Sequence, residues 1–277
     1  MEFKTIKLHK EDGIATITLD RADVLNAVSE EMAEDLAAAV DHLSEDDQTR
    51  VVIITAAGRA FCAGGDFKFD KIKGKQVLAP EDLDIWPKTT REVRRGKIPP
   101  RAQRHIILGL QNLDKPTIAV INGVAAGFGF DLTLACDIRL GSPKASFVIG
   151  YTSAGVAPDS GGTWLMPRVM GIGKTLEYIY TGDPCTAEEA YRIGLLNRLI
   201  PAEQLQEESM KIARKIAKGS PIAYRLSKLQ VYKGLGMDLE TALAFAMACV
   251  TIATGSEDHK EALRSFADRR LPEFKDR

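Results

Sequence analysis

Two continuous apolar runs constrain the fold of this 277-residue chain more than any other feature. The first extends from Val51 to Thr55 (VVIIT), and the second extends from Thr117 to Ile121 (TIAVI). A strand without alternation of apolar and polar residues is typical of a sheet that is covered on both faces. Helical patterns lie between the β-rich segments, so we expect β-α units rather than a sandwich. The predicted fold class is therefore α/β.

The segment before the first run carries two local signals. Thr5–Leu8 and Ile14–Leu19 are β-rich and flank Glu11-Asp12-Gly13, which predicts a hairpin. Ser29 precedes two glutamates and suits the N-cap of a helix with acidic residues in its first turn. Apolar residues then recur at helical spacing. They are Met32, Leu36, Val40 and Leu43.

The second half of the chain becomes helical after about Asp183. Thr186-Ala187-Glu188-Glu189 is a capping box, and an apolar stripe from Leu205 to Ala217 stops at Gly219 and Pro221. We expect the last 75 or so residues to form a helical appendage. Residues 68–100 are polar and carry four prolines, which indicates an exposed, partly mobile excursion.

Composition excludes several function classes. Hydrophobic residues make up 45% and charged residues 27% of the chain, as in ordinary globular proteins. The net charge of -1 gives no general attraction to nucleic acid or acidic membranes. There is no secretory h-region and no apolar stretch of about 18 residues. The four cysteines and four histidines lack metal-ligand spacing. We therefore predict a metal-independent protein of a reducing, cytoplasmic compartment.

Three short strings resemble chemical motifs but lack the required context. Asp159-Ser160-Gly161-Gly162 resembles the nucleophile segment of chymotrypsin-like proteases, which need an all-β double barrel. Gly171–Thr175 ends like a P-loop, but Arg168 occupies the place of its first glycine. Gly127-Phe128-Gly129 has Leu132 where a dinucleotide fingerprint needs a third glycine.

Two glycine-bearing loops follow the two apolar runs. The first spans residues 60–66 (AFCAGGD), and the second spans residues 122–131 (NGVAAGFGFD). Small residues allow a ligand to approach the backbone closely, and a helix start presents free N–H groups. One backbone N–H from each loop, aimed at one oxygen, would form an oxyanion hole. The alternative is that both are only tight βα turns.

A series of motifs resembles the enoyl-CoA hydratase/isomerase (crotonase) superfamily in order and spacing over roughly residues 10–270. The strings are Phe61–Asp66, Lys115–Gly123, Ala135–Arg139 and Pro158–Thr163, with Leu25-Asn26-Ala27 before them and Ser256-Glu257-Asp258 near the end. The resemblance implies a spiral of ββα repeats over residues 1–200, with the coenzyme A and oxyanion-hole site. It also implies a helical trimerisation region over residues 201–277 and assembly as homotrimers or dimers of trimers.

The same resemblance implies roles for individual residues. The family's two oxyanion donors match the N–H groups of Gly65 and Phe128, and the Phe128 side chain would narrow the acyl pocket. An acyl-CoA thioester would be the substrate, with coenzyme A entering only as part of it and no separate cofactor. The matched coenzyme A-binding positions are Ala63, Asp66, Lys68, Phe266 and Arg269.

The residues at the family's catalytic positions favour one reaction over another. The hydratases of the family use two glutamates, whose positions match Asp131 and Tyr151. Tyr151 removes the second carboxylate, and a tyrosine with a pKa near ~10 is a poor base at neutral pH. Asp159 lies where some isomerases of the family carry a catalytic aspartate. It is our first choice for the acid/base, although it also suits the N-cap of a helix starting near Ser160.

Three functions stay open at this point. The leading hypothesis is an enoyl-CoA isomerase that moves a proton through a thioester dienolate, with Asp159, Asp131 and Tyr151 as its catalytic residues. The second is an enoyl- or dienoyl-CoA hydratase, on a linear or cyclic acyl group, that uses Asp131 with Asp159. The third is a non-catalytic acyl-CoA-binding subunit, motivated by Tyr151.

Overall fold

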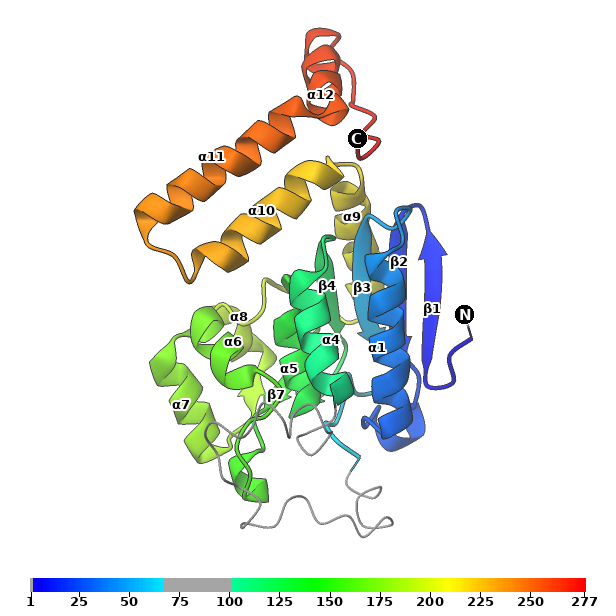
Figure 1. Cartoon of the computed structure of the whole chain (residues 1–277). Coiled ribbons are helices and arrows are strands. Elements are labelled where there is room, and N and C mark those ends of the chain that lie inside the picture. The colour runs from blue at the N-terminus through cyan, green and yellow to red at the C-terminus, as the bar shows by residue number, and fades with distance from the viewer. Residues whose placement is uncertain (1, 67–100) are drawn as a thin grey trace.

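The computed structural model describes residues 2–66 and 101–277 (Figure 1). Its centre is a six-stranded sheet in the order β1-β2-β3-β4-β6-β9. Only the β1–β2 pair is antiparallel, and the later neighbours run parallel. The strands are β1 (Ile6–Glu11), β2 (Ile14–Leu19), β3 (Val51–Ala56), β4 (Thr117–Ile121), β6 (Ile138–Gly141) and β9 (Arg198–Leu199).

A second, smaller sheet gives the fold its spiral character. It has the order β5-β7-β8, with the strands β5 (Val124–Ala126), β7 (Ser146–Val148) and β8 (Cys185–Thr186). The chain passes from β4 in the large sheet to β5 in the small one and then into α5 (Phe128–Ala135). It repeats this course through β6, β7 and α6 (Gly162–Met170). Each turn is therefore a ββα unit, which confirms the predicted α/β spiral.

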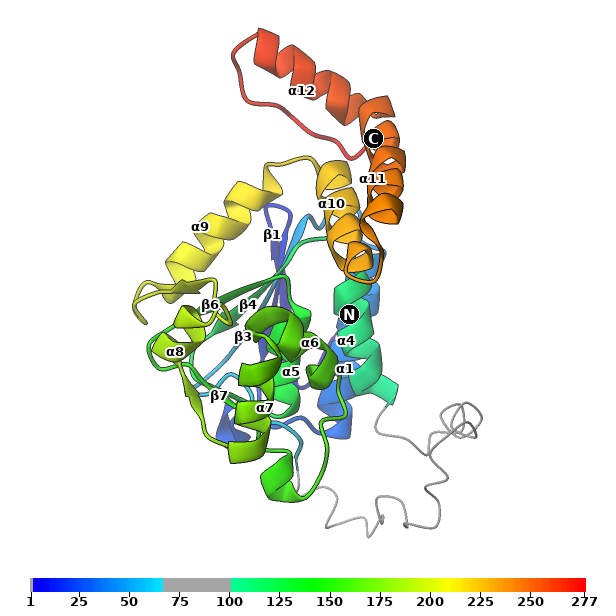
Figure 2. The same cartoon turned by 90° about the vertical axis from the view of Figure 1, so that its left-hand side faces the viewer.

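Helices cover the large sheet on both faces. Val52, Ile54 and Ala119 belong to the core on the side of α1 (Glu30–Ser44) and α4 (Arg101–Asn112). Their neighbours Ile53 and Ile118 pack on the other face, where α9 (Leu205–Ala217) lies. Figure 2 shows the sheet between these helices. This two-sided burial explains why β3 and β4 are continuous apolar runs.

Most local signals have the predicted outcome. The hairpin forms, with Glu11 paired to Ile14, and the Ser29 side chain caps α1 by accepting from the Met32 N–H. Thr186 caps α8 (Ala187–Arg192) by accepting from the Glu189 N–H. The helix after the second loop begins at Phe128, inside the glycine-bearing segment. The 68–100 segment lies outside the described residues.

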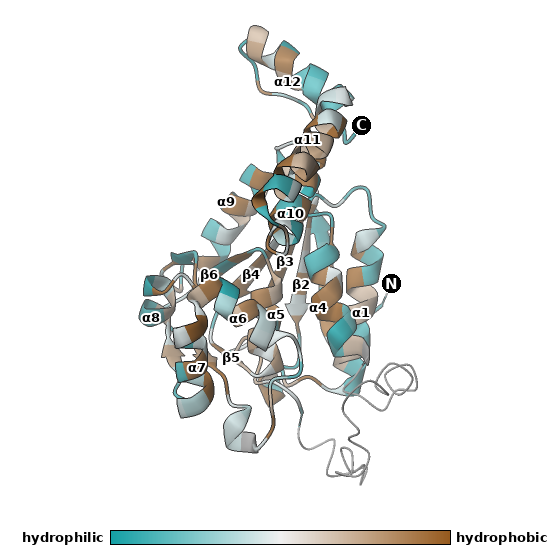
Figure 3. Ribbon diagram, turned by 60° about the vertical axis from the view of Figure 1, so that its left-hand side comes forward, coloured by the Kyte–Doolittle hydropathy of each residue, from teal (hydrophilic) through white to brown (hydrophobic). Residues whose placement is uncertain are grey.

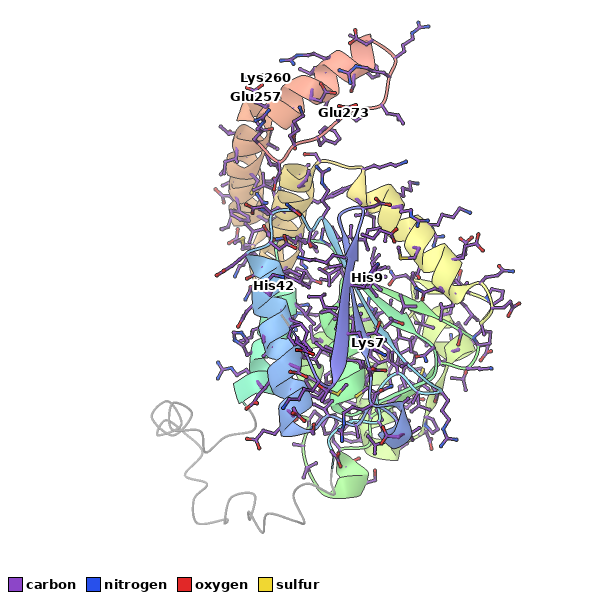
Figure 4. All side chains as sticks on the ribbon, turned by 90° about the vertical axis from the view of Figure 1, so that its right-hand side faces the viewer. Lys7, His9, His42, Glu257, Lys260 and Glu273 are labelled. Atoms are coloured by element: carbon purple, nitrogen blue, oxygen red, sulfur yellow. The ribbon has the colours of Figure 1, made fainter. Side chains whose placement is uncertain are left out.

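The edge of the large sheet is protected by charge. Lys7 and His9 on β1 point outward beside α1 (Figure 4). Lys7 also forms an ion pair of 2.6 Å with Asp20. Charged side chains on an edge strand disfavour pairing with a strand of another chain.

Beyond α9, which lies at the start of the predicted appendage and packs on the large sheet, three helices extend away from the sheets. They comprise α10 (Pro221–Gly234), α11 (Leu239–Gly255) and α12 (Glu257–Ala267), after α9. The remaining elements are α7 (Ile172–Thr181), η1 (Ala22–Val24) and η3 (Thr152–Ala154). Within the described ranges no single helix is long and apolar enough to cross a membrane. The α11–α12 pair meets that length and composition only across a bend of 69°.

Candidate active site

Backbone hydrogen bonds join the two glycine-bearing loops. Cys62 bridges Ala125, and the Ala126 N–H donates to the Cys62 carbonyl at 2.8 Å. Gly129 makes this close approach possible, because a Cβ there would lie 2.5 Å from the Cys62 carbonyl oxygen. The two loops, which are about 60 residues apart in the sequence, therefore form one backbone unit.

A second set of backbone bonds fixes the orientation of Gly65. The Val28 N–H donates to the Gly64 carbonyl at 2.7 Å, and the Asp66 N–H donates to the Val28 carbonyl at 3.1 Å. Because Gly65 lies between two residues that bond to Val28, its own N–H points away from Val28. Arg21 supports the turn with an ion pair of 3.1 Å to Asp66.

The two predicted donors are the backbone N–H groups of Phe128 and Gly65. Phe128 is the first residue of α5, so its N–H has no acceptor within the helix. Among the described residues, neither the Phe128 nor the Gly65 N–H has a hydrogen-bond acceptor. Both donors belong to the joined loops, and the positive end of α5 favours negative charge there. The Phe128 side chain itself packs into the core.

A buried carboxyl and a phenol lie behind the second loop. Asp131, in the first turn of α5, is 0% exposed, and the Tyr151 hydroxyl donates a short hydrogen bond to its Oδ2. Its Oδ1 has no partner among the described residues. Burial raises the pKa of Asp131 to about 7, the Tyr151 hydrogen bond lowers it, and the charge of Asp159 raises it. Asp131 can therefore hold or release a proton near neutral pH.

The same surroundings keep Tyr151 protonated. Burial raises its pKa well above the ordinary value, the Asp131 charge and hydrogen bond raise it further, and so does the charge of Asp159. The Ser160 hydroxyl acts in the opposite direction and lowers it. Tyr151 is therefore a hydrogen-bond donor and no base.

Asp159 is the exposed member of this group. Its Oδ1 accepts a hydrogen bond of 2.9 Å from the Ser160 hydroxyl. It does not cap a helix, because α6 begins at Gly162 with Gly161 as its N-cap. That sequence-based alternative is wrong. A Cβ at Gly162 would lie 2.3 Å from Asp131 Oδ1, so this glycine brings the 159–162 segment against the buried carboxyl.

The structure does not gather the predicted coenzyme A-binding residues. Ala63 and Asp66 lie in the first loop, where the Ala63 N–H donates to the Leu25 carbonyl at 3.0 Å. Phe266 on α12 is 86% exposed, and Arg269 follows that helix. The helix lies at one end of the molecule, and the first loop, residues 60–66, where the cyan trace leads into the grey one, lies toward the opposite end (Figures 1 and 2). Lys68 lies outside the described residues.

An apolar groove of about 690 Å³ lies between α4, α6 and α10. It contacts the segment of Asp159 only at Gly161 and includes none of Asp131, Tyr151 and Asp159. Its rim carries Arg168 and Arg225. The groove is therefore separate from the carboxylate group.

Sequence reasoning missed three residues of the site. Ser160 was considered as part of short strings and as a possible helix start, and its hydrogen bond to Asp159 has no sequence signal. Gly162 gives no indication that it contacts Asp131, because the two are far apart in the chain. Arg21 looks like an ordinary surface charge until Asp66 is placed beside it.

Comparisons with known proteins agree with this geometry. The family model for enoyl-CoA hydratase/isomerase matches residues 9–277. A short-chain-enoyl-CoA hydratase of Clostridium acetobutylicum is 32% identical over the full length of both chains. A 1,2-epoxyphenylacetyl-CoA isomerase of Escherichia coli is 33% identical over 99% of this chain and 98% of its own.

A comparison with solved structures finds the same family. An enoyl-CoA hydratase from Bacillus anthracis has a TM-score of 0.86 and 32% identity, covering 99% of this chain and 100% of that one. The fold, the joined loops and the match over almost all of the sequence have one explanation: the chain belongs to the enoyl-CoA hydratase/isomerase family of acyl-CoA enzymes.

Proposed function

We propose that this enzyme is an enoyl-CoA isomerase that moves a proton from one carbon of the acyl chain to another. One observation carries the proposal: the Tyr151 hydroxyl donates to Asp131. By the family resemblance, these two residues match the positions of the two glutamates of the hydratases. Hydration needs one group to activate water and another to deliver a proton. Here the two corresponding side chains bind each other, which supports isomerisation.

The thioester oxygen would lie at the Gly65 and Phe128 N–H groups. These donors stabilise negative charge that develops when a C–H bond next to the thioester breaks, and such a donor contributes roughly 3 kcal/mol in known enzymes. Asp159 would remove that proton and return it two carbons away. Its exposed carboxylate suits a base that meets the acyl chain.

A hydratase is the second candidate. It is favoured by Asp131, because a carboxyl with a pKa of about 7 could assist water, together with Asp159. Relatives of both names match the chain to a similar extent. The acyl group, linear or cyclic, and a setting in fatty or aromatic acid metabolism stay predictions. So do the absence of a metal or other cofactor and a cytoplasmic location.

One assay separates the two reactions. The enzyme is mixed with a 3-enoyl-CoA in oxygen-18-labelled water, and the conjugated 2-enoyl-CoA is followed by its absorbance. Isomerisation predicts conjugated product without labelled oxygen. Labelled 3-hydroxyacyl-CoA as the main product would contradict the proposal and favour the hydratase.

We further propose a homotrimer or a dimer of trimers. A helix that is apolar all round must be buried. Hydrophobic residues, coloured brown, recur along α11 (Figure 3), yet several of its large apolar side chains are exposed. They are Leu239, Leu243, Met247, Val250 and Ile252. A neighbouring copy would cover them, and its coenzyme would meet Phe266 and Arg269 of this chain.

Light scattering should give the mass of a trimer or hexamer for the unmodified chain, and the Leu243→Glu variant should give a lower mass. A monomeric mass for the unmodified chain would contradict the assembly.

A further inference from the structure

Residues 21–28 lie beside the first loop and have an uncommon backbone conformation. Leu25 and Asn26 have φ angles of 56° and 55°, and they are the only adjacent pair of non-glycine residues with positive φ in the described ranges. This left-handed region costs free energy for an L-residue, although asparagine tolerates it better than most. Such strain persists only where the surrounding contacts hold it, and it clusters at functional sites. The contacts of this pair are therefore candidates for a functional role.

The Asn26 side chain makes its contacts inside the core, where it is 0% exposed. Its Oδ1 accepts a hydrogen bond from the Arg21 N–H at 2.8 Å. Its Nδ2 donates to the carbonyls of Ala57 and Ala60, at 2.9 and 3.0 Å. Both hydrogens and the oxygen of the side-chain amide are thus used. Asn26 therefore ties the 21–28 segment to the turn that leads into the first loop.

Backbone hydrogen bonds continue this junction along the first loop. The Ala63 N–H donates to the Leu25 carbonyl at 3.0 Å, and the Val28 N–H donates to the Gly64 carbonyl at 2.7 Å. Asn26 lies between Leu25 and Val28 in the chain. Its backbone conformation therefore sets the direction in which the polar groups of these two residues meet the loop.

The turn at residues 57–60 depends on the Asn26 amide. Within the described part of the chain, no other hydrogen bond reaches the carbonyl of Ala57 or that of Ala60. A buried carbonyl that loses its partner costs free energy. Removal of the amide therefore favours a shift of this turn, and the loop that follows it must adjust.

We propose that Asn26 is a positioning residue that holds the first loop so that the Gly65 N–H faces the thioester oxygen. The proposal rests on the proposed function, in which this N–H stabilises the enolate. A donor that is fixed before the substrate arrives stabilises developing charge without reorganisation of the site. Loss of Asn26 would leave the Gly65 N–H present but free to tilt. The transition state would then lose more stabilisation than the bound substrate.

The kinetics of isomerisation test this role through Asn26→Ala, which removes the three side-chain hydrogen bonds. With a 3-enoyl-CoA we expect kcat to fall by roughly 10- to 100-fold while KM changes little. Asn197→Ala is the matched control, because Asn197 Oδ1 accepts from the Arg139 N–H at 2.8 Å and ties two segments at the β6–β9 edge of the sheet. The control should keep the wild-type kcat even where its Tm falls.

An infrared measurement reports the donor itself and needs no turnover. Hexanoyl-CoA, which has no double bond to move, is bound to each enzyme with and without carbon-13 at its thioester carbonyl. The difference spectrum gives the stretching frequency of that carbonyl, which hydrogen bonds from N–H groups lower. Wild type and Asn197→Ala should lower this frequency equally, and Asn26→Ala should lower it clearly less.

Asn26→Gly decides the question if the alanine variant does not fold. Glycine adopts positive φ without strain, so this variant lacks the side-chain bonds but should unfold at a higher temperature than Asn26→Ala. Its kcat and its carbonyl frequency should nevertheless depart from wild type as those of Asn26→Ala do. Wild-type values of both in Asn26→Gly would show that the side-chain bonds do not position the donor, and the proposal would be wrong.

Failure of this role is distinguishable from failure of the proposed function. A wild-type carbonyl frequency and kcat in Asn26→Ala would overturn the role of Asn26 while the oxyanion site stands. A wild-type enzyme that leaves the carbonyl frequency unchanged would overturn the oxyanion site, and the role of Asn26 with it. If wild type lowers the frequency but converts no 3-enoyl-CoA, the isomerase proposal fails, and the infrared comparison alone decides the role of Asn26.

Discussion

The two halves of the candidate site are held in different ways. The half that offers the Gly65 and Phe128 N–H groups is built from backbone bonds among the two loops and the Val28 segment. The half around Asp131 is built from side chains, namely Tyr151, Ser160 and Asp159. A backbone N–H group keeps its chemistry when the side chain of its residue changes. A side-chain network changes its chemistry when one residue changes.

The two halves therefore have different tasks in the proposed function: one stabilises the enolate, and the other determines the reaction. In the proposed function the loops would hold an enolate oxygen, which several acyl-CoA reactions require. In the same proposal the carboxylates and the phenol would decide where protons move. A family can therefore keep the first half and diversify through the second, in line with relatives named both hydratase and isomerase.

The largest loss of turnover is expected from a substitution that separates the two joined loops. Gly129→Ala places a Cβ 2.5 Å from the Cys62 carbonyl oxygen and 2.6 Å from the Cys62 Cβ, so the loops must separate. Loss of one aligned donor costs about 100- to 1,000-fold in turnover. Steady-state kinetics with a 3-enoyl-CoA would measure this loss.

A glycine elsewhere provides the control for this prediction. Gly173 lies in α7, and a Cβ there would meet nothing within 4 Å. Gly173→Ala should keep the wild-type turnover. If Gly129→Ala turned over at the wild-type rate, the joined loops would not hold the oxyanion donors.

A smaller effect, a pH-dependent change in stability, is expected from a substitution of Asp131. The pKa of Asp131 is about 7 in the folded chain, against an ordinary value of 3.8. Between these values the folded state binds more protons than the unfolded state, so the wild type loses stability as pH rises through this window. Asp131→Asn cannot titrate. Its Tm relative to wild type should rise by a few degrees between about pH 4 and pH 7.

The exposed Asp183 serves as a matched control, since Asp183→Asn changes a carboxyl that is not buried. Its Tm difference from wild type should stay nearly constant over the same range. A constant difference for Asp131→Asn as well would show that Asp131 keeps an ordinary pKa in the folded protein.

Sequence patterns predicted the fold because each pattern has a physical cause that lies within its own segment of the chain. The continuous runs at β3 and β4 reflect burial on both faces, and Ser29 and Thr186 mark helix starts that their side chains cap. Residues 128–131 were assigned to the second loop although α5 begins at Phe128, because the glycines of that segment suggested a turn rather than the first turn of a helix. Steric contact with Cys62, which explains Gly129, is invisible in the local sequence.

The site was less predictable than the fold. Family position identified Asp131, Tyr151 and Asp159, but the hydrogen bond between the first two depends on how α5 and the 149–151 segment meet. Burial, which sets the pKa of Asp131, is a property of the packed core. Gly162 acts through Asp131, which is distant in the chain. The placement of Phe266 and Arg269 relative to a coenzyme depends on the assembly, which one chain does not contain.

The most direct measurement compares the isomerisation rate of a 3-enoyl-CoA by wild type and Asp159→Asn, with Asp183→Asn as control. If Asp159 is the acid/base, we expect turnover to fall by about 100- to 10,000-fold with KM nearly unchanged, while the control keeps the wild-type rate. An Asp159→Asn enzyme that isomerises the substrate at the wild-type rate would contradict the assignment of Asp159.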